Sequence, residues 1–424
     1  MNRSVNAYRV YLGLSSAEAL FSSMFFVVAT VWRVEAAGFN PLQLVLVGTV
    51  MESAIFVFEI PTGVVADAFS RKLSIIIGQA MMGVAFVMEA LFPRFEVILA
   101  AQAFWGIGYT FTSGATEAWI AGEVGDGNIG NTFVRGTQVG LIGALAGSVV
   151  GAGLASVRLN LGMLCAGGAG LILAVCLVVL MPETGYRATP RADRSTWQHM
   201  GDTLRGGLRI VRLRPALLSI LGIGLFFGLY SEGYDRLSDA HLLQDMHIPT
   251  IGNLSYVVWF GIIDVGAMLL SLVATEVVRR RVNLRSHVGV ARALFGLTAL
   301  LSAGVIAFGL SRDFYVAVVA MWAIAVLRKS INPLYDAWIA QHTDPAVRAT
   351  VISLAGQVDA FGQIAGGPAI GALGTVRGLR VALVTAGALL SPALLLLART
   401  IRRAPNETAP SEAADLEAAA RTRV

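Results

Sequence analysis

Four carboxyl side chains that interrupt long apolar runs are the residues of this sequence best suited to chemistry. They are Glu18, Glu52, Asp264 and Asp359. An ionised carboxylate is costly in an apolar environment, so such a group is suited to binding and releasing a proton. We expect Glu18 and Glu52 to be proton-coupled acids, with Asp264 and Asp359 as further candidates. Structural pairing with a base is an equally good explanation for each of the four.

Two adjacent bases, Arg328 and Lys329, stand about midway along another apolar run. Adjacent residues of a helix point about 100° apart, so both can face one cavity only at its edges. One interpretation is that they attract an anionic group of a substrate. We slightly favour internal pairing instead, because an unpaired buried base is costly and the four acids named above are available.

Aromatic residues in the apolar runs offer a second kind of contact for a small molecule. Tyr230 and Tyr234 stand four residues apart in the run over 215–240. Rings that face a cavity suit an amphipathic or drug-like molecule, although ordinary helix packing explains many aromatic residues equally well. We name both tyrosines as candidate substrate contacts.

A short polar turn between two of the apolar runs carries a recognisable spacing. Gly63, Asp67 and Arg71 follow one another at intervals of four, and Lys72 comes next. Residues four apart share a helix face, a glycine permits close helix contact, and bases favour the cytoplasmic side. The turn resembles the signature G-x-x-x-D-x-x-x-R-[RK] of the major facilitator superfamily of transporters, although two of the intervening residues depart from the usual pattern.

The resemblance implies a cavity between two halves, lined by the first, fourth, seventh and tenth spans. The third, sixth and twelfth spans are nearly free of charge apart from Glu89 in the third, so we expect them to face lipid. The resemblance to drug:proton antiporters is incomplete. Gln102 stands where those proteins carry an arginine in the fourth span, which puts their usual proton relay in doubt.

Several charged residues near the cytoplasmic ends of the spans are candidates for a gate. Glu117 and Asp336 occupy equivalent places in the two halves. We expect Arg71 to pair with Glu117 or Glu123 and to latch the inner side shut, because a partly solvated ion pair can break and re-form. A static ion pair is the alternative. Glu59 belongs either to this gate or to the proton-coupled acids.

The composition requires lipid around most of the chain. Of the 424 residues, 56% are hydrophobic and only 14% are charged, against about 25% charged residues in an average soluble domain. Cys165 and Cys176 lie too far apart on one predicted helix to form a disulfide. The net charge of +5 follows the membrane topology, so it does not indicate nucleic acid.

The hydropathy pattern predicts an all-α membrane protein with twelve transmembrane helices in two pseudo-symmetric six-helix bundles. The predicted spans are 8–33, 41–65, 72–92, 96–122, 132–157, 159–181, 215–240, 250–278, 287–311, 313–340, 346–375 and 378–400. Most of the 32 Lys and Arg residues fall on the side that holds both termini, which makes that side cytoplasmic. We expect the protein in the inner (plasma) membrane, with an uncleaved first span.

The two halves repeat each other at one constant offset. Glu117-Ala-Trp-Ile-Ala121 recurs as Asp336-Ala-Trp-Ile-Ala340, and Gly143 and Gly362 match at the same offset. Parallel six-span repeats are an arrangement of transporters, with the substrate site between the halves. The predicted parts are an N-terminal bundle over 1–181, a cytoplasmic linker with an amphipathic helix over 182–214, a C-terminal bundle over 215–400 and a tail over 401–424.

His241, Asp245 and His247 form the one cluster of metal-ligand type, but their spacing fits no closed metal site, and a solvated turn explains them better. The sequence has no phosphate loop and no nucleophile elbow, so we expect neither an enzyme nor a bound cofactor or metal. The predicted function is export of a small amphipathic molecule in exchange for protons, by a monomer that binds no nucleic acid. Proton-coupled uptake of an organic anion is the alternative, and a membrane sensor without transport is a third possibility.

Overall fold

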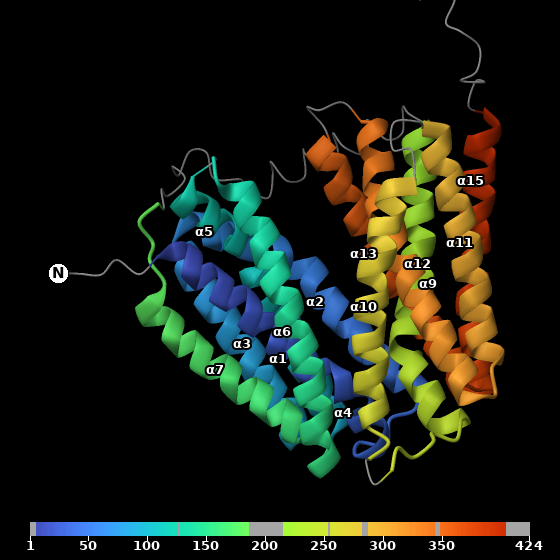
Figure 1. Ribbon diagram of the computed structural model, residues 1–424, viewed down its shortest axis with the longest axis horizontal. Coiled ribbons are helices and arrows are strands. Elements are labelled where there is room, and N and C mark those ends of the chain that lie inside the picture. The colour runs from blue at the N-terminus through green and yellow to red at the C-terminus, as the bar shows by residue number, and fades with distance from the viewer. Residues whose placement is uncertain are drawn as a thin grey trace, which may run out of the picture.

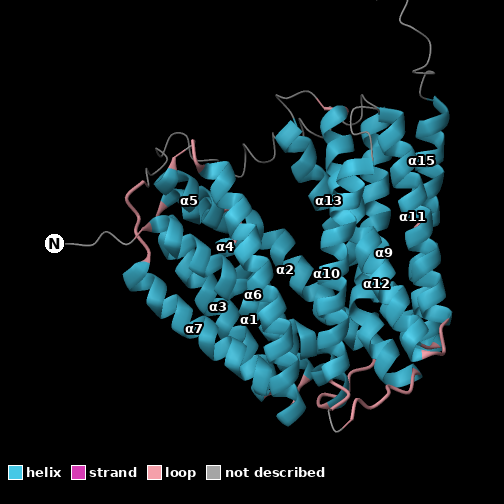
Figure 2. Ribbon diagram, viewed as in Figure 1, coloured by secondary structure: helices cyan, strands magenta, loops and turns pink. Residues whose placement is uncertain are grey.

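The protein is helical throughout the part of the chain that the structure describes. This computed structural model describes residues 6–125, 127–185, 215–252, 255–281, 287–343 and 348–403, and every regular element in these ranges is a helix (Figure 2). The helices are α1 (Ala7–Glu35), α2 (Pro41–Ala68), α3 (Arg71–Leu91), α4 (Phe95–Thr112), α5 (Ala115–Val124), α6 (Ile129–Val157), α7 (Leu161–Leu180), α9 (Pro215–Asp245), α10 (Val258–Arg281), α11 (His287–Leu310), α12 (Phe314–Gln341), α13 (Arg348–Arg377), α14 (Leu379–Ala388) and α15 (Ser391–Arg403).

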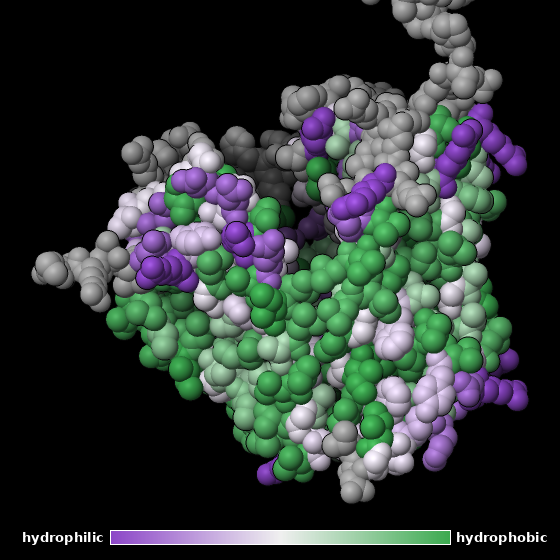
Figure 3. Space-filling model, viewed as in Figure 1, coloured by the Kyte–Doolittle hydropathy of each residue, from purple (hydrophilic) through white to green (hydrophobic). Residues whose placement is uncertain are grey.

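Ten helical segments among the described residues are long and apolar enough to cross a membrane. On the face drawn in Figure 3, a broad belt of apolar side chains separates polar side chains at the two ends. The prediction of an all-α membrane protein is therefore supported. The count of twelve spans stays a prediction, because neither α4 nor α13 is among the ten segments.

Two predicted spans are each divided into two helices. The span predicted at 96–122 breaks between α4 and α5, where Gly114 has a φ of 70° that most residues avoid. The span predicted at 378–400 consists of α14 and α15, with a turn between them. Every other predicted span coincides with one helix to within a few residues, except that α10 begins at Val258 rather than near 250.

The helices form two groups that lie side by side (Figure 1). Helices α1–α7 pack mainly on one another and are called the N half; α9–α15 do the same and are called the C half. The domain limits at 181, 214 and 400 stay predictions. The amphipathic helix expected in the linker and most of the tail lie outside the described residues.

Glycines hold the same pair of helices together in both halves. A Cβ atom added to Gly143 of α6 would lie 2.2 Å from the carbonyl oxygen of Ser16 in α1. The matching Gly362 of α13 would bring a Cβ atom to 2.5 Å from the carbonyl oxygen of Leu225 in α9. Only glycine permits such an approach, and the equivalent contacts of the two matched glycines support the sequence repeat.

The two halves meet at one end of the molecule, where α1 is connected to α2. We call this contact the seam; it is formed by α1, α2 and α6 on one side and by α9, α10 and α13 on the other. In it, the Leu42 amide donates to Thr375 Oγ1 at 3.0 Å, and Gly371 packs against Val45. At the opposite end the halves diverge, and the space-filling surface is hollowed between them (Figure 3).

Candidate substrate cavity and gate residues

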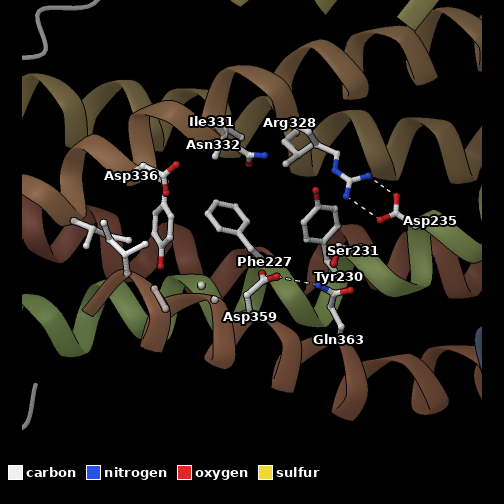
Figure 4. A pocket seen from close by; sticks show the side chains of 17 residues that line it. Phe227, Tyr230, Ser231, Asp235, Arg328, Ile331, Asn332, Asp336, Asp359 and Gln363 are labelled. Carbon is white, nitrogen blue, oxygen red and sulfur yellow. Dashed lines mark hydrogen bonds and ion pairs between the residues drawn. The ribbon is translucent and has the colours of Figure 1, made fainter. Parts of the chain in front are cut away.

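A cavity of about 400 Å³ lies between α9, α12 and α13, and we call it the C-half cavity. Polar and aromatic side chains of these three helices line the same cavity (Figure 4). Among the lining residues are Phe227, Tyr230, Asp235, Arg328, Asn332 and Asp359. The cavity therefore combines apolar rings with charged groups, as sites for amphipathic molecules do.

Arg328 lines the cavity and forms a two-pronged ion pair with Asp235 of α9. Nη2 donates to Oδ2 at 2.8 Å, and Nη1 donates to Oδ1. The guanidinium also lies over the rings of Tyr230 and Tyr234, at 5.8 and 5.9 Å from their centroids. Internal pairing is thus correct for Arg328, but the partners expected from the sequence are wrong, because Asp235 takes that place.

Lys329 does not share the position of its neighbour. It is exposed, lines none of the cavities described here, and forms no ion pair with a described residue. The 100° turn between adjacent helix residues accounts for the difference. The two bases are therefore not brought together on one site.

Asp359 and Asp336 both line the C-half cavity. Gln363 donates from Nε2 to Asp359 Oδ2 at 2.9 Å within α13. Asp336 and its counterpart Glu117 are both exposed, and no hydrogen bond or ion pair joins either of them to another described residue. Asp336 therefore belongs to the cavity wall, about two turns from Arg328 along α12, while its gate role stays a prediction.

Glu18 lies inside the N half, away from this cavity. It borders a small pocket between α1, α3 and α7 together with Gln79 and Phe86. Glu52 behaves differently, because it lies within electrostatic reach of Glu232, Arg236 and Asp359 of the C half. The two predicted proton-coupled acids are therefore in separate environments, and neither forms an ion pair with Arg328.

Two further acids join the halves. Glu59 of α2 accepts a hydrogen bond from Gln357 Nε2 of α13 at 3.3 Å. Asp264 of α10 accepts a hydrogen bond from the hydroxyl of Ser148 in α6. Both contacts cross from one half to the other, so these acids contribute to how the halves are held together.

The signature turn contacts helix α5 and the end of α7. Arg71 Nη1 donates to the Ala118 carbonyl oxygen at 2.8 Å, and Nη2 donates to Asp67 at 3.4 Å. Lys72 Nζ donates to the Val178 carbonyl oxygen at 2.9 Å. A Cβ atom added to Gly63 would meet nothing within 4 Å, so the close helix contact expected there is wrong.

One acidic residue after α7 and one in α5 hold the same surface. Glu183 accepts from the Ser70 hydroxyl at 2.7 Å and from the Lys72 amide at 3.0 Å. Glu123 accepts from the Thr184 and Gly185 amides at 2.6 and 2.7 Å. The sequence analysis assigned Glu123 to a latch with Arg71, and it missed this backbone role.

The N half contains a buried ion pair that the sequence analysis also missed. Arg33 Nε and Glu89 Oε1 are 2.7 Å apart, and the two residues are 2% and 0% exposed. Gln102 Nε2 donates to the other oxygen of Glu89 at 2.6 Å. Helix α3 packs between α4 and α7 and buries this carboxylate on that side. Leu73, Val84 and Leu91 of α3 are exposed, so the expectation that another side of α3 faces lipid stays a prediction.

His241 is not part of a solvated turn. Helix α9 continues to Asp245, so His241 and Asp245 lie one turn apart, and 2.7 Å separates Nδ1 from Oδ2. The His241 side chain is fully buried against the ring of Phe308. Arg380 of α14 completes this group, with Nε 3.7 Å from Asp245 Oδ2.

The comparisons with known proteins agree with this arrangement. A family model described as Major Facilitator Superfamily matches residues 12–327. The chain belongs to this superfamily. A relative from Bacillus subtilis (strain 168), "Uncharacterized MFS-type transporter YxaM", is 24% identical over 362 residues, which cover 84% of this chain and 86% of that protein. This major facilitator protein is therefore a multi-pass membrane transporter rather than an enzyme.

Solved structures share the fold at low sequence identity. The nucleoside transporter NupG (D323A mutant) has a TM-score of 0.77 and 14% identity, with 93% of this chain and 99% of that chain covered. A bacterial homologue of the human lysosomal transporter Spinster, in an inward-facing and unoccupied conformation, has a TM-score of 0.72 and 14% identity, with 95% and 98% covered. These likenesses concern the fold of this superfamily member and leave its substrate open.

Proposed function

We propose that this transporter exports a small amphipathic or drug-like molecule by alternating access, in exchange for protons. The observation that carries the proposal is the C-half cavity between α9, α12 and α13, in a molecule whose halves diverge at one end and are joined by the seam at the other. A volume of about 400 Å³ falls within the range of about 300–1,000 Å³ that is usual for small-molecule sites.

The charges of the cavity favour a neutral or cationic polar group on the substrate. Arg328 is neutralised by Asp235, whereas Asp336 and Asp359 have no cationic partner among the described residues. The ring of Phe227 lies beside these groups (Figure 4). An amphipathic molecule could therefore place an apolar body on the rings and its polar group near the two free carboxylates.

The proposed proton carriers are Glu18 and Glu52, with Asp359 as a further candidate. Glu52 has the stronger support, because it faces acids and a base of the opposite half. A proton bound there would change the repulsion between the halves, which is how coupling to alternating access would arise. Glu18 has weaker support, since it borders a pocket within the N half.

We further propose that the termini and the open end face the cytoplasm, with the protein in the plasma membrane. Most bases of the sequence lie on that side, and the signature turn lies there as well. In this orientation the described conformation opens inward, and the seam is the closed outer side.

Proton-coupled uptake of an organic anion is the second candidate, and the presence of Arg328 in the cavity favours it. Its weakness is that Nη1 and Nη2 of that guanidinium already hold Asp235, which neutralises its charge. Nucleoside and Spinster-type transporters share the fold, so the fold alone does not identify the substrate. A sensor would bind a ligand and produce no flux.

The deciding experiment is flux in proteoliposomes with an imposed pH gradient, with lipophilic cations compared with organic anions. Export predicts that cations move against the proton gradient and that Glu52→Gln removes this coupling. Anion accumulation that Arg328→Ala abolishes would replace export by uptake. Binding without movement of either class would instead indicate a sensor.

A further inference from the structure

A second cavity lies in the seam itself, between the two halves. It has a volume of about 310 Å³, and its walls come from α1, α9, α10 and α12. It shares no lining residue with the C-half cavity. Two carboxyl groups border it, Asp239 of α9 and Asp264 of α10, along with the ring of Phe26 from α1. The sequence analysis named Asp264 but not Asp239.

Each of these carboxyl groups contacts a hydroxyl group of the opposite half. Ser148 of α6 is fully buried and donates from Oγ to Asp264. Asp239 lies within hydrogen-bonding reach of Thr30 in α1. Both acids of the C half are therefore held against the N half only while the seam is closed.

The internal repeat gives the second of these contacts a simple origin. The glycine contacts make Ser16 of α1 equivalent to Leu225 of α9, and counting on equally along both helices makes Thr30 equivalent to Asp239. Two equivalent positions of parallel repeats can contact each other only close to the axis that relates the repeats. At this meeting point one half supplies a hydroxyl group and the other a carboxyl group.

No described base neutralises either acid. Neither Asp239 nor Asp264 is in an ion pair with a described residue. The charges that Asp239 senses are those of Asp264 and of Asp235, and Asp235 is already paired with Arg328 of α12. From α1 and α6, the groups that face the two acids are hydroxyls, which carry no charge. Tyr234 of α9 also lines this cavity, as an uncharged phenol.

We propose that Asp239 and Asp264 form a proton-dependent latch: closing the seam binds a proton at this pair, and opening the seam releases it. Closure brings two carboxylates together in a water-poor space, where like charges repel strongly and an ionised group is poorly solvated. A proton removes this cost and leaves an acid that can still hydrogen-bond to the hydroxyl groups. Opening returns both groups to water, where the ionised forms are stable.

The direction of the pH effect follows from linkage. If the closed seam holds more protons than the open seam, acidification favours closure and alkalinisation favours opening. The ratio of closed to open molecules would change by up to about tenfold per pH unit for one proton. Another titratable contact between the halves, Tyr256 with Glu35, does not interfere. Burial and its hydrogen bond to Glu35 raise the pKa of Tyr256 above its ordinary value of 10.

The test places spin labels on the two sides of the seam, at the exposed positions Ala36 and Val376. Cys165 and Cys176 are free and exposed, so the labels go into a variant in which both are alanine. The protein is placed in lipid nanodiscs without substrate, and the distance between the labels is measured from pH 5 to pH 9. We expect the short-distance population to fall as the pH rises.

Variants of the two acids separate the latch from other causes. Asp239→Asn and Asp264→Asn should each weaken the pH dependence, and the double variant should keep the seam closed at every pH. Glu96→Gln, which changes an exposed acid in the first turn of α4, should behave like the parent. If the double variant folds poorly, Ser148→Ala and Thr30→Ala remove only the hydroxyl partners, and each should shift the populations toward the open state at every pH.

Because Glu52 is proposed to titrate between the halves as well, the double variant is also measured with Glu52→Gln added. A distance distribution that does not change with pH would overturn the latch, as would a pH response that the double variant loses only when Glu52→Gln is added. The latch rests on the proposed function only through the assumption that the seam opens. Since the labels report opening without any cargo, a failed flux assay and a failed latch are distinguishable. A pH response without proton-coupled export would leave the latch standing and overturn only the export proposal.

Discussion

The two halves use buried charge in different ways. In the N half, Arg33 and Gln102 both donate to the buried carboxylate of Glu89, and no cavity described here includes these three residues. In the C half, Arg328 and Asp235 also pair, but at the wall of a cavity and with about a third of each side chain exposed. The same kind of interaction is sealed inside the helix packing in one half and borders a cavity in the other.

This difference indicates that the two repeated halves have different roles, one in stability and one in transport. Charges that are fully paired and dry can hold a bundle rigid while it moves as a body. Charges that border water-filled space can exchange partners when a ligand arrives. We therefore expect changes in the N half to alter stability first and changes in the C half to alter transport first.

The largest effect is expected from Glu89→Gln, which leaves the Arg33 guanidinium buried without a counter-charge. Breaking one partner of a buried pair costs about 3–5 kcal/mol, so the purified protein should unfold at a distinctly lower temperature. Fluorescence-detected thermal unfolding in detergent measures this. Arg94→Gln, an exposed base nearby, should change stability by no more than about 0.5 kcal/mol. Equal effects of the two variants would contradict the structural role of the pair.

The next effect concerns a feature that the halves share. Gly143→Ala and Gly362→Ala would each drive a methyl group into a backbone carbonyl of the neighbouring helix, at a cost of about 1–3 kcal/mol. Both should lower the unfolding temperature to a similar degree. Gly63→Ala is the matched control, because nothing lies within 4 Å of the added methyl group. A large loss in only one half would show that the glycine contacts are not equivalent.

A smaller effect on stability but a clear effect on transport is expected from Asp235→Asn. The pair with Arg328 is partly exposed, so its loss should cost at most about 1 kcal/mol of stability. The unpaired guanidinium would repel a cationic substrate, and we expect at least about a tenfold loss of flux, or about 1.4 kcal/mol. The double variant Asp235→Asn/Arg328→Gln should recover part of the flux. Wild-type flux in the single variant would remove the pair from the substrate path.

Features that depend on the residue pattern of a single helix could be predicted from the sequence. Hydropathy located most of the helices, because an apolar run is a property of one helix at a time. The repeat likewise identified Gly362 as the counterpart of Gly143. The division of one predicted span at Gly114 escaped the pattern, since a positive φ is invisible in a hydropathy profile.

Pairings between helices could not be predicted in the same way. The partner of Arg328 depends on how α9 and α12 are rotated about their axes, and several acids had the right depth. Arg33 and Glu89 lie near the ends of their spans, where the sequence suggests contact with solvent. His241 was misread because α9 runs one turn further than its apolar residues indicate.

The smallest effect, and the sharpest test of how the C half presents its charges, is expected from Lys329→Ala. Lys329 is exposed and lines no cavity described here, so its removal should leave both the flux and its dependence on cation concentration within about twofold of the wild type. Arg328→Ala, one residue away, should reduce flux strongly, because it frees Asp235 and strips the cation from Tyr230 and Tyr234. Similar losses in the two variants would mean that bulk charge on α12 matters rather than the single geometry at Arg328. The net charge of α12 would then determine the flux, and the C-half cavity would no longer be supported as the substrate-binding site.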